Sequence, residues 1–318
     1  MLNEMKYVYA VYQERSFSKA AKKLFISQPA LSNMVRKAEK EMGAPIFDRS
    51  TIPLTVTKDG AYYIQSIEKI LFIERNMQSY FRDRTELQAG TLSLGGSSFF
   101  CSFIFPSLIG QFKTRYPGIA IDLLEGNVRE LKKGLDAESL DLIVETALSP
   151  DDTSLEQYFY KKEKIILAVP ESYPVNRRLQ PYRLTQKDIV SDRFVRPDVE
   201  PVPLAEFKDT PFITMKPGND MYKRSMKICR NSGFSMQVAM LVDQVLTSMN
   251  IASNGIGAVF IRSDIVKCLP EDNRLVYYKL GDPLAERSVS FAVKRGRYLT
   301  SAMREFMRMA GVKIEGEK

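Results

Sequence analysis

The first part of the chain carries apolar side chains at the spacing of short helices. Between residues 4 and 14 the apolar positions recur three and four residues apart and share one helix face: Met5, Val8, Tyr9 and Tyr12. The run SFS at residues 16–18 breaks this pattern, and Ser18 is expected to cap a second helix over residues 19–24. The pattern therefore predicts two short helices with a break between them.

A third helix is predicted to follow a tight turn at residues 25–26. Ser27 suits its N-cap, Pro29 is tolerated in its first turn, and Gly43 is a usual stop. Its predicted buried stripe comprises Leu31, Val35 and Ala38. Two helices joined by a tight turn form a helix-turn-helix. The segments predicted to form a small β wing after it are residues 45–50 (PIFDRS) and 53–56 (PLTV).

Residues 57–89 carry a longer helical pattern. Its broken apolar seam comprises Ile64, Ile67, Leu71, Met77, Tyr80 and Phe81. A helix of this length with no domain around it must bury its stripe elsewhere, and the simplest partner is the same helix of a second copy. We therefore expect a dimer contact through Ile64, Ile67 and Leu71.

After Gly90 the pattern changes to strands that alternate with helices. The predicted strands are residues 91–94, 119–123, 140–144, 165–169, 235–241 and 256–261. The predicted helices are residues 128–135, 221–231 and 244–253, and another helix follows the turn GGSS at residues 95–98. Such alternation predicts a mostly parallel α/β sheet. Residues 172–211 are rich in proline and charge and are expected to form loops and short helices.

Charge is the part of the composition that adds most to this picture. The chain has 318 residues, 44% hydrophobic and 26% charged, which is typical of a soluble protein of two or three domains. Its net charge is +8, and residues 1–60 alone hold seven Lys and three Arg against four Glu and two Asp, a net +4. This concentration in the predicted helix-turn-helix suits a phosphate backbone. The polar first residues and the short apolar stretch at 99–109 predict a cytoplasmic protein without a signal peptide or a membrane partner.

The scarce residue types exclude several kinds of chemistry. The chain contains no histidine, which excludes Ser-His-Asp catalysis, Cys-His catalysis and histidine metal ligands. Its three cysteines, Cys101, Cys229 and Cys268, form no CxxC pair, which argues against a disulfide framework or a zinc site. The turn GGSSF at residues 95–99 superficially resembles a nucleophile elbow but lacks the fifth-position glycine and a histidine base. We therefore expect no catalytic site, no metal and no cofactor.

The first sixty residues also resemble a known family. Residues 16–32 (SFSKAAKKLFISQPALS) are closely similar to the DNA-binding domain of LysR-type transcriptional regulators. The likeness continues through Glu39, residues 45–49 (PIFDR) and residues 56–60 (VTKDG). Weaker likeness to the effector domain of the family is carried by residues 112–117 (FKTRYP), 125–127 (EGN), 140–144 (LDLIV), 255–257 (GIG) and 259–260 (VF).

The resemblance implies an architecture that is α/β overall. It combines an all-α winged helix-turn-helix domain, a long linker helix, and a two-lobed α/β effector domain similar to periplasmic binding proteins, with the ligand in the cleft. The expected boundaries are residues 1–58 for the DNA-binding domain, 59–89 for the linker and dimerisation helix, 91–161 with 268–300 for lobe I, and 162–267 for lobe II. The implied partners are double-stranded operator DNA, a second copy in a homodimer or homotetramer, a small-molecule effector and RNA polymerase.

The exposed face of the third helix is the candidate for reading bases. Opposite the buried stripe it presents Gln28, Ser32, Asn33 and Arg36. Asn and Gln can bond adenine bidentately and Arg can bond guanine, although a merely solvated helix face is the alternative. Phosphate or minor-groove contacts are expected from Ser18, Lys19, Lys22 and Arg49, and Ser27 and Pro29 complete the set. Asn33 stands where the family is often basic, and the wing STIP at residues 50–53 is poorer in Arg, so operator preference should not be copied from a relative.

The turn after the first strand of the effector domain is the candidate ligand cradle. Ser97, Ser98 and Phe99 open a helix after two glycines, which are expected to let a ligand approach the backbone closely. Free N–H groups and hydroxyls at such a helix start suit a carboxylate or another anion. Residues at other strand ends, helix starts and loops are expected to line the same cleft: Asn127, Thr146, Asn219 and Gln244. A plain turn between a strand and a helix is the alternative.

Three rival functions fit the sequence less well. A thiol redox sensor of the same family would use Cys229 and Cys268, and equal DNA binding under reducing and oxidising conditions would argue against it. A solute-binding or transport module is opposed by the helix-turn-helix and by the lack of a predicted signal peptide. An enzyme is opposed by the absence of histidine and of a P-loop.

We predict that DNA affinity falls steeply with salt, because the net charge of +4 on residues 1–60 is doubled in a dimer. With about six to ten phosphates neutralised, the slope of log affinity against log salt should lie near about −5 to −9. Fluorescence anisotropy over a salt series measures this slope. A slope shallower than about −2 would contradict an interface dominated by phosphate contacts.

Overall fold

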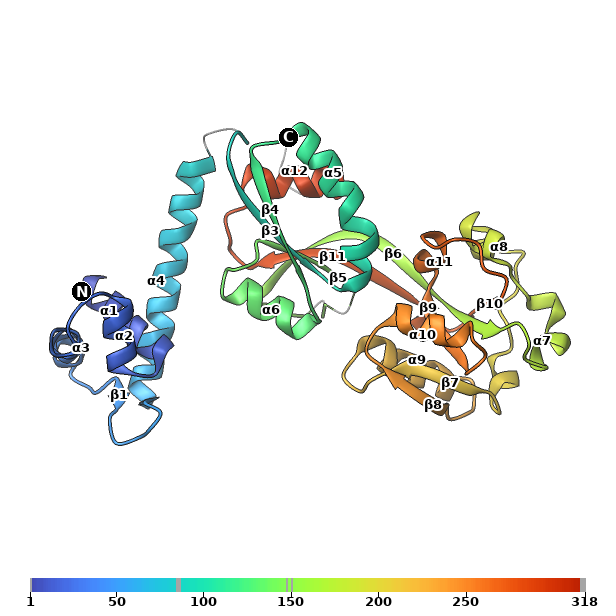
Figure 1. Ribbon diagram of the computed structural model, residues 1–318, viewed down its shortest axis with the longest axis horizontal. Helices are drawn as coiled ribbons and strands as arrows, with labels where there is room; N and C mark the ends of the chain where they lie inside the picture. The colour runs from blue at the N-terminus through green and yellow to red at the C-terminus, as the bar shows by residue number, and fades with distance from the viewer. Residues whose placement is uncertain (1, 84–86, 147, 150, 315–318) are drawn as a thin grey trace. The chain divides into compact units, whose positions relative to one another are not determined.

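The chain divides into two compact units, Met1–Arg84 and Thr85–Lys318, which we term the N-terminal and C-terminal units (Figure 1). The computed structural model describes residues 2–83, 87–146, 148–149 and 151–314. Within these residues, none of the helices is both long enough and apolar enough to cross a bilayer.

The N-terminal unit is a group of helices with a two-stranded wing. Its elements are α1 (Leu2–Glu14), α2 (Phe17–Lys23), α3 (Gln28–Met42), β1 (Phe47–Asp48), β2 (Thr55–Val56) and α4 (Lys58–Arg82). The apolar stripes of α1 and α3 meet in one core that includes Val8, Leu31 and Val35. β1 and β2 pair antiparallel, with Phe47 opposite Val56. The predicted helix-turn-helix and wing are confirmed.

Two helix ends differ from the prediction. Ser16, not Ser18, caps α2, because its backbone is extended and its Oγ accepts a hydrogen bond from the Lys19 N–H at 3.3 Å. Ser18 lies inside the first turn of α2. α4 ends at Arg82 instead of residue 89: residues 84–86 lie outside the described residues, and Leu87 has a left-handed φ of 61°, which a helix does not allow.

The burial of α4 contradicts the expected dimer contact. Ile64 and Ile67 are only 3% and 0% exposed, because they pack into the core of the N-terminal unit. Leu71 is half-buried against the same core. The large apolar side chains that α4 leaves exposed are Tyr62, Ile73, Met77, Tyr80 and Phe81. The prediction was wrong because a helix of 25 residues carries more than one apolar stripe, and spacing alone does not say which stripe its own domain covers.

The C-terminal unit contains two α/β lobes. Lobe I is built from β3 (Gly90–Gly96), a π-helical turn (Phe100–Ile104) that runs into α5 (Phe105–Arg115), β4 (Ile119–Glu125), α6 (Val128–Asp136), β5 (Leu142–Glu145), β11 (Glu286–Lys294) and α12 (Ser301–Met309). Lobe II is built from α7 (Val175–Arg178), α8 (Gln186–Val190), β7 (Pro211–Met215), α9 (Asp220–Asn231), β8 (Gln237–Val242), α10 (Val245–Ala252), β9 (Ala258–Arg262), α11 (Ser263–Lys267) and β10 (Leu275–Lys279). The loops and short helices predicted for residues 172–211 are present, with 3₁₀ turns at Gln180–Tyr182, Arg193–Val195 and Leu204–Phe207.

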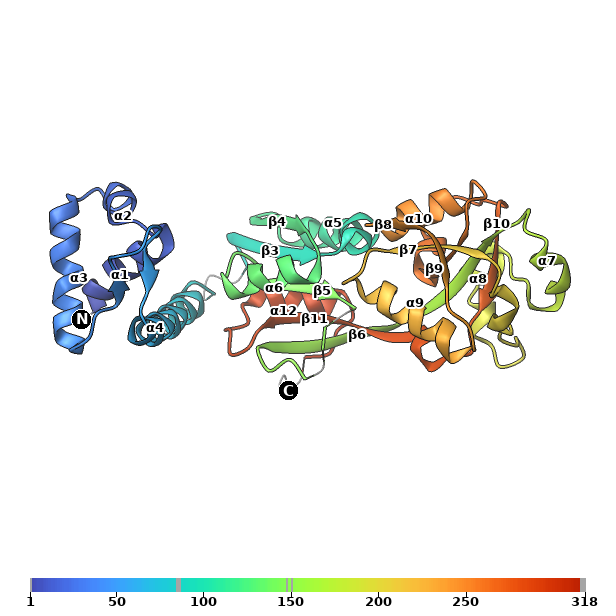
Figure 2. The same ribbon diagram turned by 90° about the horizontal axis from the view of Figure 1, so that it is seen from below.

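The long strand β6 (Leu155–Pro170) joins the lobes, and both views show it running from one into the other (Figures 1 and 2). Residues 155–164 pair antiparallel with β11, and residues 165–170 pair antiparallel with β9 and β10. The order of the strands in the described residues is β4-β3-β5-β11-β6-β9-β7-β8, with β10 beside β6. β3, β4 and β5 pair in parallel, and so do β7, β8 and β9. The predicted parallel pairing is therefore right among β3, β4 and β5 and among β7, β8 and β9. It is wrong where β6 and β11 join these sets, because β11 pairs antiparallel with β5 and β6, and β6 pairs antiparallel with β9 and β10.

The predicted lobe boundaries need one correction. β10, within the segment 268–300 assigned to lobe I, pairs instead with the lobe II part of β6, and Tyr277 bridges to Leu184. β11 does belong to lobe I, where it pairs with β5. α12 also belongs there, because Phe306 packs against Phe105 and Phe112 of α5. β10, β11 and α12 were not predicted, since their partners lie far away in the sequence.

We predict that Ile67→Ala and Ile73→Ala, both on α4, have different consequences. Ile67→Ala should destabilise the N-terminal unit by about 2–5 kcal/mol, because it opens a cavity in a fully buried site. Ile73→Ala should destabilise the N-terminal unit itself far less, because that side chain is 66% exposed in the single chain, and any stability it adds through a second copy should vary with protein concentration, unlike that of Ile67. Urea unfolding of the two variants, beside the unmodified protein, measures both effects. Equal destabilisation by the two substitutions would contradict the assignment of the buried stripe.

Candidate functional sites: a recognition helix and a ligand cleft

α3 is positioned to present a polar face. Ser27 caps it, with Oγ accepting a hydrogen bond from the Ala30 N–H at 3.3 Å, and Gly43 ends it at φ 71°. Its buried side chains are Leu31, Val35 and Ala38, as predicted. Gln28, Asn33 and Arg36 are exposed on the other side, and Ser32 is half-buried. The arrangement places an amide, a second amide and a guanidinium on one helix, which is the chemistry that base edges in a major groove accept.

Two ion pairs hold α3 within the N-terminal unit. The Lys37 Nζ lies 2.6 Å from the Glu4 Oε1, which ties α3 to α1. Two residues further along α3, Glu39 accepts hydrogen bonds from the Ile46 N–H at 3.0 Å and from the Arg49 guanidinium at 2.9 Å. Glu39 therefore fixes the wing against α3. The sequence marked Glu39 only as part of the family motif. Its contacts with the wing became visible only in the structure.

Arg49 is more constrained than a free phosphate contact. Besides its ion pair with Glu39, its guanidinium lies 5.0 Å from the centroid of the Phe17 ring. Its side chain is still about one-third exposed, so the remaining N–H groups reach solvent. Besides the DNA contact predicted for it, Arg49 thus also holds the wing against α2 and α3.

The other predicted DNA-contacting residues lie on the outside of α2 and at the start of α3. All of them are exposed: Ser18, Lys19, Lys22, Ser27 and Pro29. The Ser18 Oγ donates a hydrogen bond to the Gln28 Oε1 at 3.3 Å, which links α2 to the first turn of α3. Lysine ammonium groups beside the recognition helix suit contacts to phosphate.

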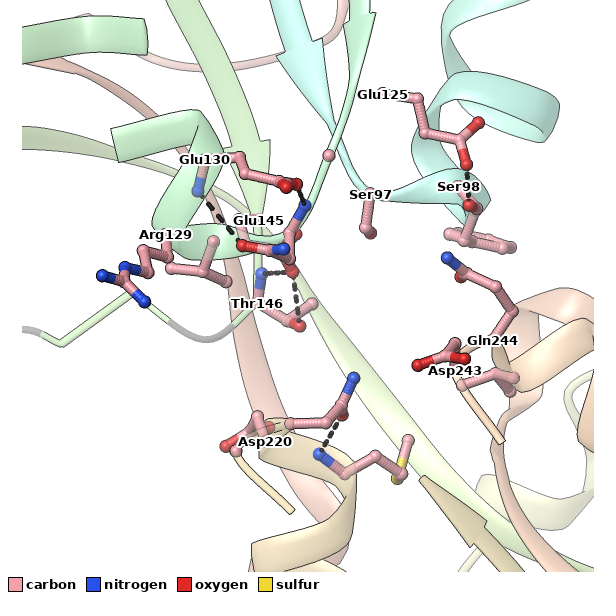
Figure 3. A pocket seen from close by; sticks show the side chains of 18 of the residues that line it. Ser97, Ser98, Glu125, Arg129, Glu130, Glu145, Thr146, Asp220, Asp243 and Gln244 are labelled. Atoms are coloured by element: carbon pink, nitrogen blue, oxygen red, sulfur yellow. Dashed lines mark hydrogen bonds between the residues drawn. The ribbon is translucent and has the colours of Figure 1, made fainter. Parts of the chain in front are cut away.

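A cleft of about 1020 Å³ separates lobes I and II (Figure 3). The structure brings all seven predicted effector-site residues into its lining: Ser97, Ser98, Phe99, Asn127, Thr146, Asn219 and Gln244. Figure 3 shows Ser97 and Glu125 on one side and Asp220, Asp243 and Gln244 on the other. Side chains from both lobes thus face one space large enough for a small molecule.

Ser97 occupies the end of β3 and the start of a helical segment. Its carbonyl accepts a hydrogen bond from the Cys101 N–H at 3.1 Å, which closes the first turn. The Ser97 Oγ is buried and has no hydrogen-bond partner among the described residues, whereas the Ser98 Oγ donates to Glu125. A hydroxyl without a partner at a helix N-terminus is an unused donor beside a positive dipole end.

Glycine is required at positions 95 and 96, before Ser97, for a different reason from the one expected. A Cβ on Gly95 would lie 2.8 Å from side-chain atoms of Leu131 and Leu140. A Cβ on Gly96 would lie 3.1 Å from Phe100 and Phe105. Close packing of the lobe I core therefore requires these glycines. The expectation that they let a ligand approach the backbone is wrong.

Three of the other predicted cleft residues have local hydrogen bonds. The Asn127 Oδ1 accepts from the Glu130 N–H at 3.1 Å and caps α6, and the Asn219 Oδ1 accepts from the Met221 N–H at 2.8 Å and caps α9. The Thr146 Oγ1 donates to Glu145 at 3.1 Å. Gln244 flanks α10 without a side-chain cap hydrogen bond. Helix capping thus explains part of the reason why asparagine stands at positions 127 and 219.

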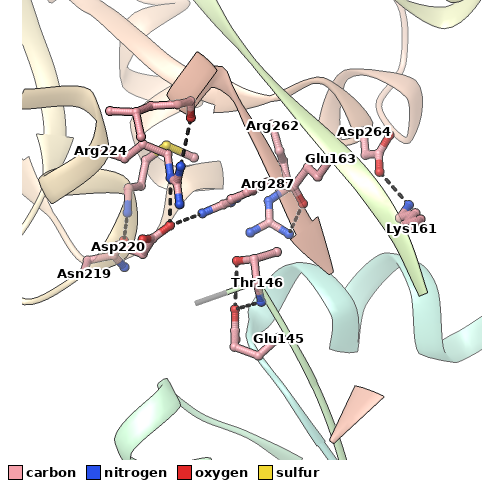
Figure 4. A network of polar contacts seen from close by, with 12 residues as sticks. Glu145, Thr146, Lys161, Glu163, Asn219, Asp220, Arg224, Arg262, Asp264 and Arg287 are labelled. Carbon is pink, nitrogen blue, oxygen red and sulfur yellow. Dashed lines mark hydrogen bonds and ion pairs between the residues drawn. The ribbon is translucent and has the colours of Figure 1, made fainter. Parts of the chain in front are cut away.

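A buried ionic network beside the cleft was missed by sequence reasoning (Figure 4). Arg287 on β11 donates to the Glu163 Oε1 from Nε at 2.8 Å and from Nη2 at 2.5 Å, and its Nη1 donates to Asp220 at 2.6 Å. Arg262 at the end of β9 lies 3.2 Å from the Glu163 Oε2 as an ion pair. No local motif signals this cluster, because its members come from different elements that are distant from one another in the sequence.

The two buried arginines differ in their protonation equilibria. Burial lowers the pKa of the Arg262 guanidinium. Burial also opposes the charge of Arg287, but its ion pairs with Glu163 and Asp220 outweigh burial and raise its pKa. Both arginines stay charged, but the charge of Arg287 is compensated by its hydrogen bonds and ion pairs, and the charge of Arg262 is compensated less completely.

Comparison with protein families gives a match for each unit. Residues 2–61 match the model described as "Bacterial regulatory helix-turn-helix protein, lysR family". Residues 85–312 match the model described as "LysR substrate binding domain".

Individual relatives carry related descriptions. The chain is 27% identical over 309 residues to YcgK of Bacillus subtilis (strain 168), described as an uncharacterized HTH-type transcriptional regulator, and the match covers 96% of this chain and 92% of that protein. It is 25% identical over 307 residues to a probable RuBisCO transcriptional regulator of Emiliania huxleyi, with the same shares of 96% and 92%.

Solved structures share the fold. A full-length OxyR variant from Pseudomonas aeruginosa superposes with a TM-score of 0.65 at 18% identity, covering 98% of this chain and 93% of that one. CbnR in complex with its target DNA superposes with a TM-score of 0.58 at 16% identity, covering 98% of this chain and 99% of that one.

We predict that substitutions in the N-terminal unit separate base contacts from phosphate contacts. Asn33→Ala and Arg36→Ala should each lower DNA affinity by about 1–3 kcal/mol and relax preference at particular base pairs. Lys22→Ala should weaken binding to all sequences alike, because a phosphate contact carries no sequence information. Selection of binding sites from a random library, followed by sequencing, compares the three variants. The same preferred sequence from all three would refute this division of roles.

Proposed function

This chain belongs to the LysR family of transcriptional regulators, and from that premise we propose that a small anionic effector in the cleft controls how a homo-oligomer of the chain occupies operator DNA. The observation that carries the proposal is the Ser97 hydroxyl, buried in the cleft without a hydrogen-bond partner among the described residues. A buried polar group without a partner costs free energy unless a ligand or water satisfies it. The helix that starts beside Ser97 directs N–H groups and the positive end of its dipole at the same place, which favours an anion.

The exposed stripe of α4 supports the oligomeric part of the proposal. Ile73, Met77 and Phe81 recur four residues apart and are each more than half exposed. Such a stripe suits pairing with the same helix of a second copy. A dimer would present two α3 helices to the two half-sites of a pseudo-palindromic operator.

A second contact would turn the dimer into a tetramer. The outermost strands, β4 and β8, each expose neighbouring apolar side chains, among them Leu123, Leu124 and Leu241. Exposed apolar edges of this kind favour association with a further surface.

Three further statements belong to the proposal. We expect the chain to act in the cytoplasm, where its DNA lies. We expect no catalysis, because the sequence lacks histidine and no base is hydrogen-bonded to the Ser97 hydroxyl among the described residues. We expect contact with RNA polymerase, since a regulator bound beside a promoter changes transcription through the access or recruitment of the polymerase.

A thiol switch has less support than an effector. Cys229 is fully buried, and burial raises the pKa of its thiol to about 12. Burial also raises the pKa of the Cys268 thiol, although Cys268 itself is exposed. The thiolate is the form that reacts with oxidants, so both cysteines are poorly suited to sensing.

A thermal-shift screen of metabolites on the full chain identifies the effector, because a ligand that binds only the folded state raises its Tm. We predict that Ser97→Ala then lowers effector affinity by about 1.5–3 kcal/mol, about 10- to 150-fold, through loss of a hydrogen bond to a charged group. Isothermal calorimetry measures the affinity. Ser107→Ala, on the exposed side of α5 and outside the cleft, is the control and should not change it.

The same variants should bind operator DNA normally without effector, since Ser97 lies in the C-terminal unit and the recognition helix in the N-terminal unit. Unaltered effector affinity in Ser97→Ala would place the anion elsewhere. A loss of operator binding would show that Ser97 maintains the fold.

A further inference from the structure

Arg262 lies at the junction of the two lobes. It is the last residue of β9 in lobe II, and its backbone pairs with Ile165 of β6. Its side chain is only 7% exposed, and its guanidinium lies 4.4 Å from the centroid of the Phe99 ring in lobe I. It also belongs to the lining of the cleft. A cation carried by one lobe therefore rests on an aromatic side chain of the other.

Two nitrogens of the Arg262 guanidinium lack hydrogen bonds to the described part of the chain. Its Nε and Nη1 are both buried and make none with the described residues. The 3.2 Å approach of Nη1 to the Glu163 Oε2 is a charge contact without hydrogen-bond geometry, and that oxygen also lacks a donor among the described residues. The other Glu163 oxygen is taken by two hydrogen bonds from Arg287. Glu163 is thus committed to Arg287 and leaves Arg262 incompletely paired.

An incompletely paired buried arginine is unfavourable for folding. A guanidinium presents five N–H donors in a planar fork, and burial removes the water that would otherwise satisfy them. Contact with the rings of Phe99 and Phe100 offsets part of this cost but accepts no hydrogen bond in the plane of the fork. Buried groups of this kind in a cleft are candidates for ligand binding.

Resting on the proposed function, we infer that Arg262 is the counter-ion of the effector and that its partner is a carboxylate held jointly by Arg262 and Ser97. Phe99, on whose ring the guanidinium lies, is two residues beyond Ser97, so a donor from lobe II and a donor from lobe I line the same part of the cleft. A carboxylate accepts two parallel hydrogen bonds from a guanidinium and has lone pairs left for a hydroxyl. The Ser97 hydroxyl and the Arg262 guanidinium can therefore both donate to one carboxylate.

The same geometry assigns the remainder of the effector and its effect on the lobes. Apolar side chains from both lobes line the cleft, among them Phe103, Val128, Met221 and Leu246. The effector is therefore a small carboxylate with an apolar body. Because Ser97 belongs to lobe I and Arg262 to lobe II, a carboxylate bonded to both ties the lobes together.

The test compares carboxylates with amides of the same shape. Three carboxylates are titrated into the full chain at constant ionic strength: acetate, hexanoate and 3-phenylpropionate. Each is compared with its own amide, which is acetamide, hexanamide or 3-phenylpropanamide respectively. Thermal shift and calorimetry give the preference, defined as the ratio of amide to carboxylate dissociation constants. For the unmodified protein the preference should be at least about 10 for the hexanoate and 3-phenylpropionate pairs. In Arg262→Met it should fall by about 10- to 150-fold, the loss expected for hydrogen bonds to a charged group.

Controls separate a binding role from a structural one. Arg183→Met removes another lobe II arginine, which pairs with Glu171 at 2.8 Å outside the cleft, and should keep the full preference. Arg262→Lys keeps the charge but loses the planar fork, so it should keep part of the preference. Without ligand, Arg262→Met should lower the Tm less than Arg287→Met does, because Arg287 makes three hydrogen bonds in the network and the Arg262 Nε and Nη1 make none.

Each outcome decides between the two proposals. If Arg262→Met retains the carboxylate preference while Ser97→Ala loses it, the anion site stands and the assignment of Arg262 is overturned. If the unmodified protein prefers none of the three carboxylates over its amide, the anionic effector itself is overturned. If Arg262→Met is too unstable to assay, Arg262→Lys decides: an unchanged preference with a lowered Tm would make Arg262 a purely structural cation.

Discussion

A single strand, β6, belongs to the sheets of both lobes, and the C-terminal unit depends on that constraint. β6 pairs with β11 over its first ten residues and with β9 and β10 over its last six. Glu163 lies close to the point of change, almost wholly buried, and a charge in that position must be paired. Arg287 of β11 meets this requirement and reaches on to Asp220 at the start of α9. The ion pair therefore connects the returning strand, the shared strand and lobe II.

The cleft that forms beside this junction contains two kinds of polar residue. Asn127 and Asn219 cap helices, and their side-chain oxygens are occupied by the backbone. The Ser97 Oγ and the Arg262 Nε and Nη1 make no hydrogen bond with the described residues. The first kind makes the walls of the cleft rigid, and the second leaves donors for a molecule that the chain does not contain. Residues that stabilise the cleft are thus distinguished from the residues proposed to bind the effector by their hydrogen bonds, not by their positions in the lining.

In the N-terminal unit, Glu39 and α4 hold the wing and the helical core together. Glu39 ties the wing to α3 through the backbone of Ile46 and the side chain of Arg49. Ile64 and Ile67 pack into the same core as the buried stripe of α3. α4 contacts α1, which in turn contacts α3, and α4 also exposes Ile73 and Phe81. One helix therefore supports the DNA-binding face and offers an apolar surface for a second copy.

The sequence by itself determined the features that depend on neighbouring residues. The stripe of Leu31, Val35 and Ala38, the cap at Ser27 and the stop at Gly43 follow from helix geometry, so α3 and its exposed face could be predicted. The strand ends and helix starts after Gly90 were local enough to predict seven of the residues that line the cleft. Tertiary structure decided whatever depends on partners far apart in the chain. It chose which stripe of α4 is buried, and it made Gly95 and Gly96 packing residues because Leu131, Leu140, Phe100 and Phe105 fill their space. It also brought Glu163, Asp220, Arg262 and Arg287 together, since an ion pair requires proximity in space and leaves no periodic signal along the chain.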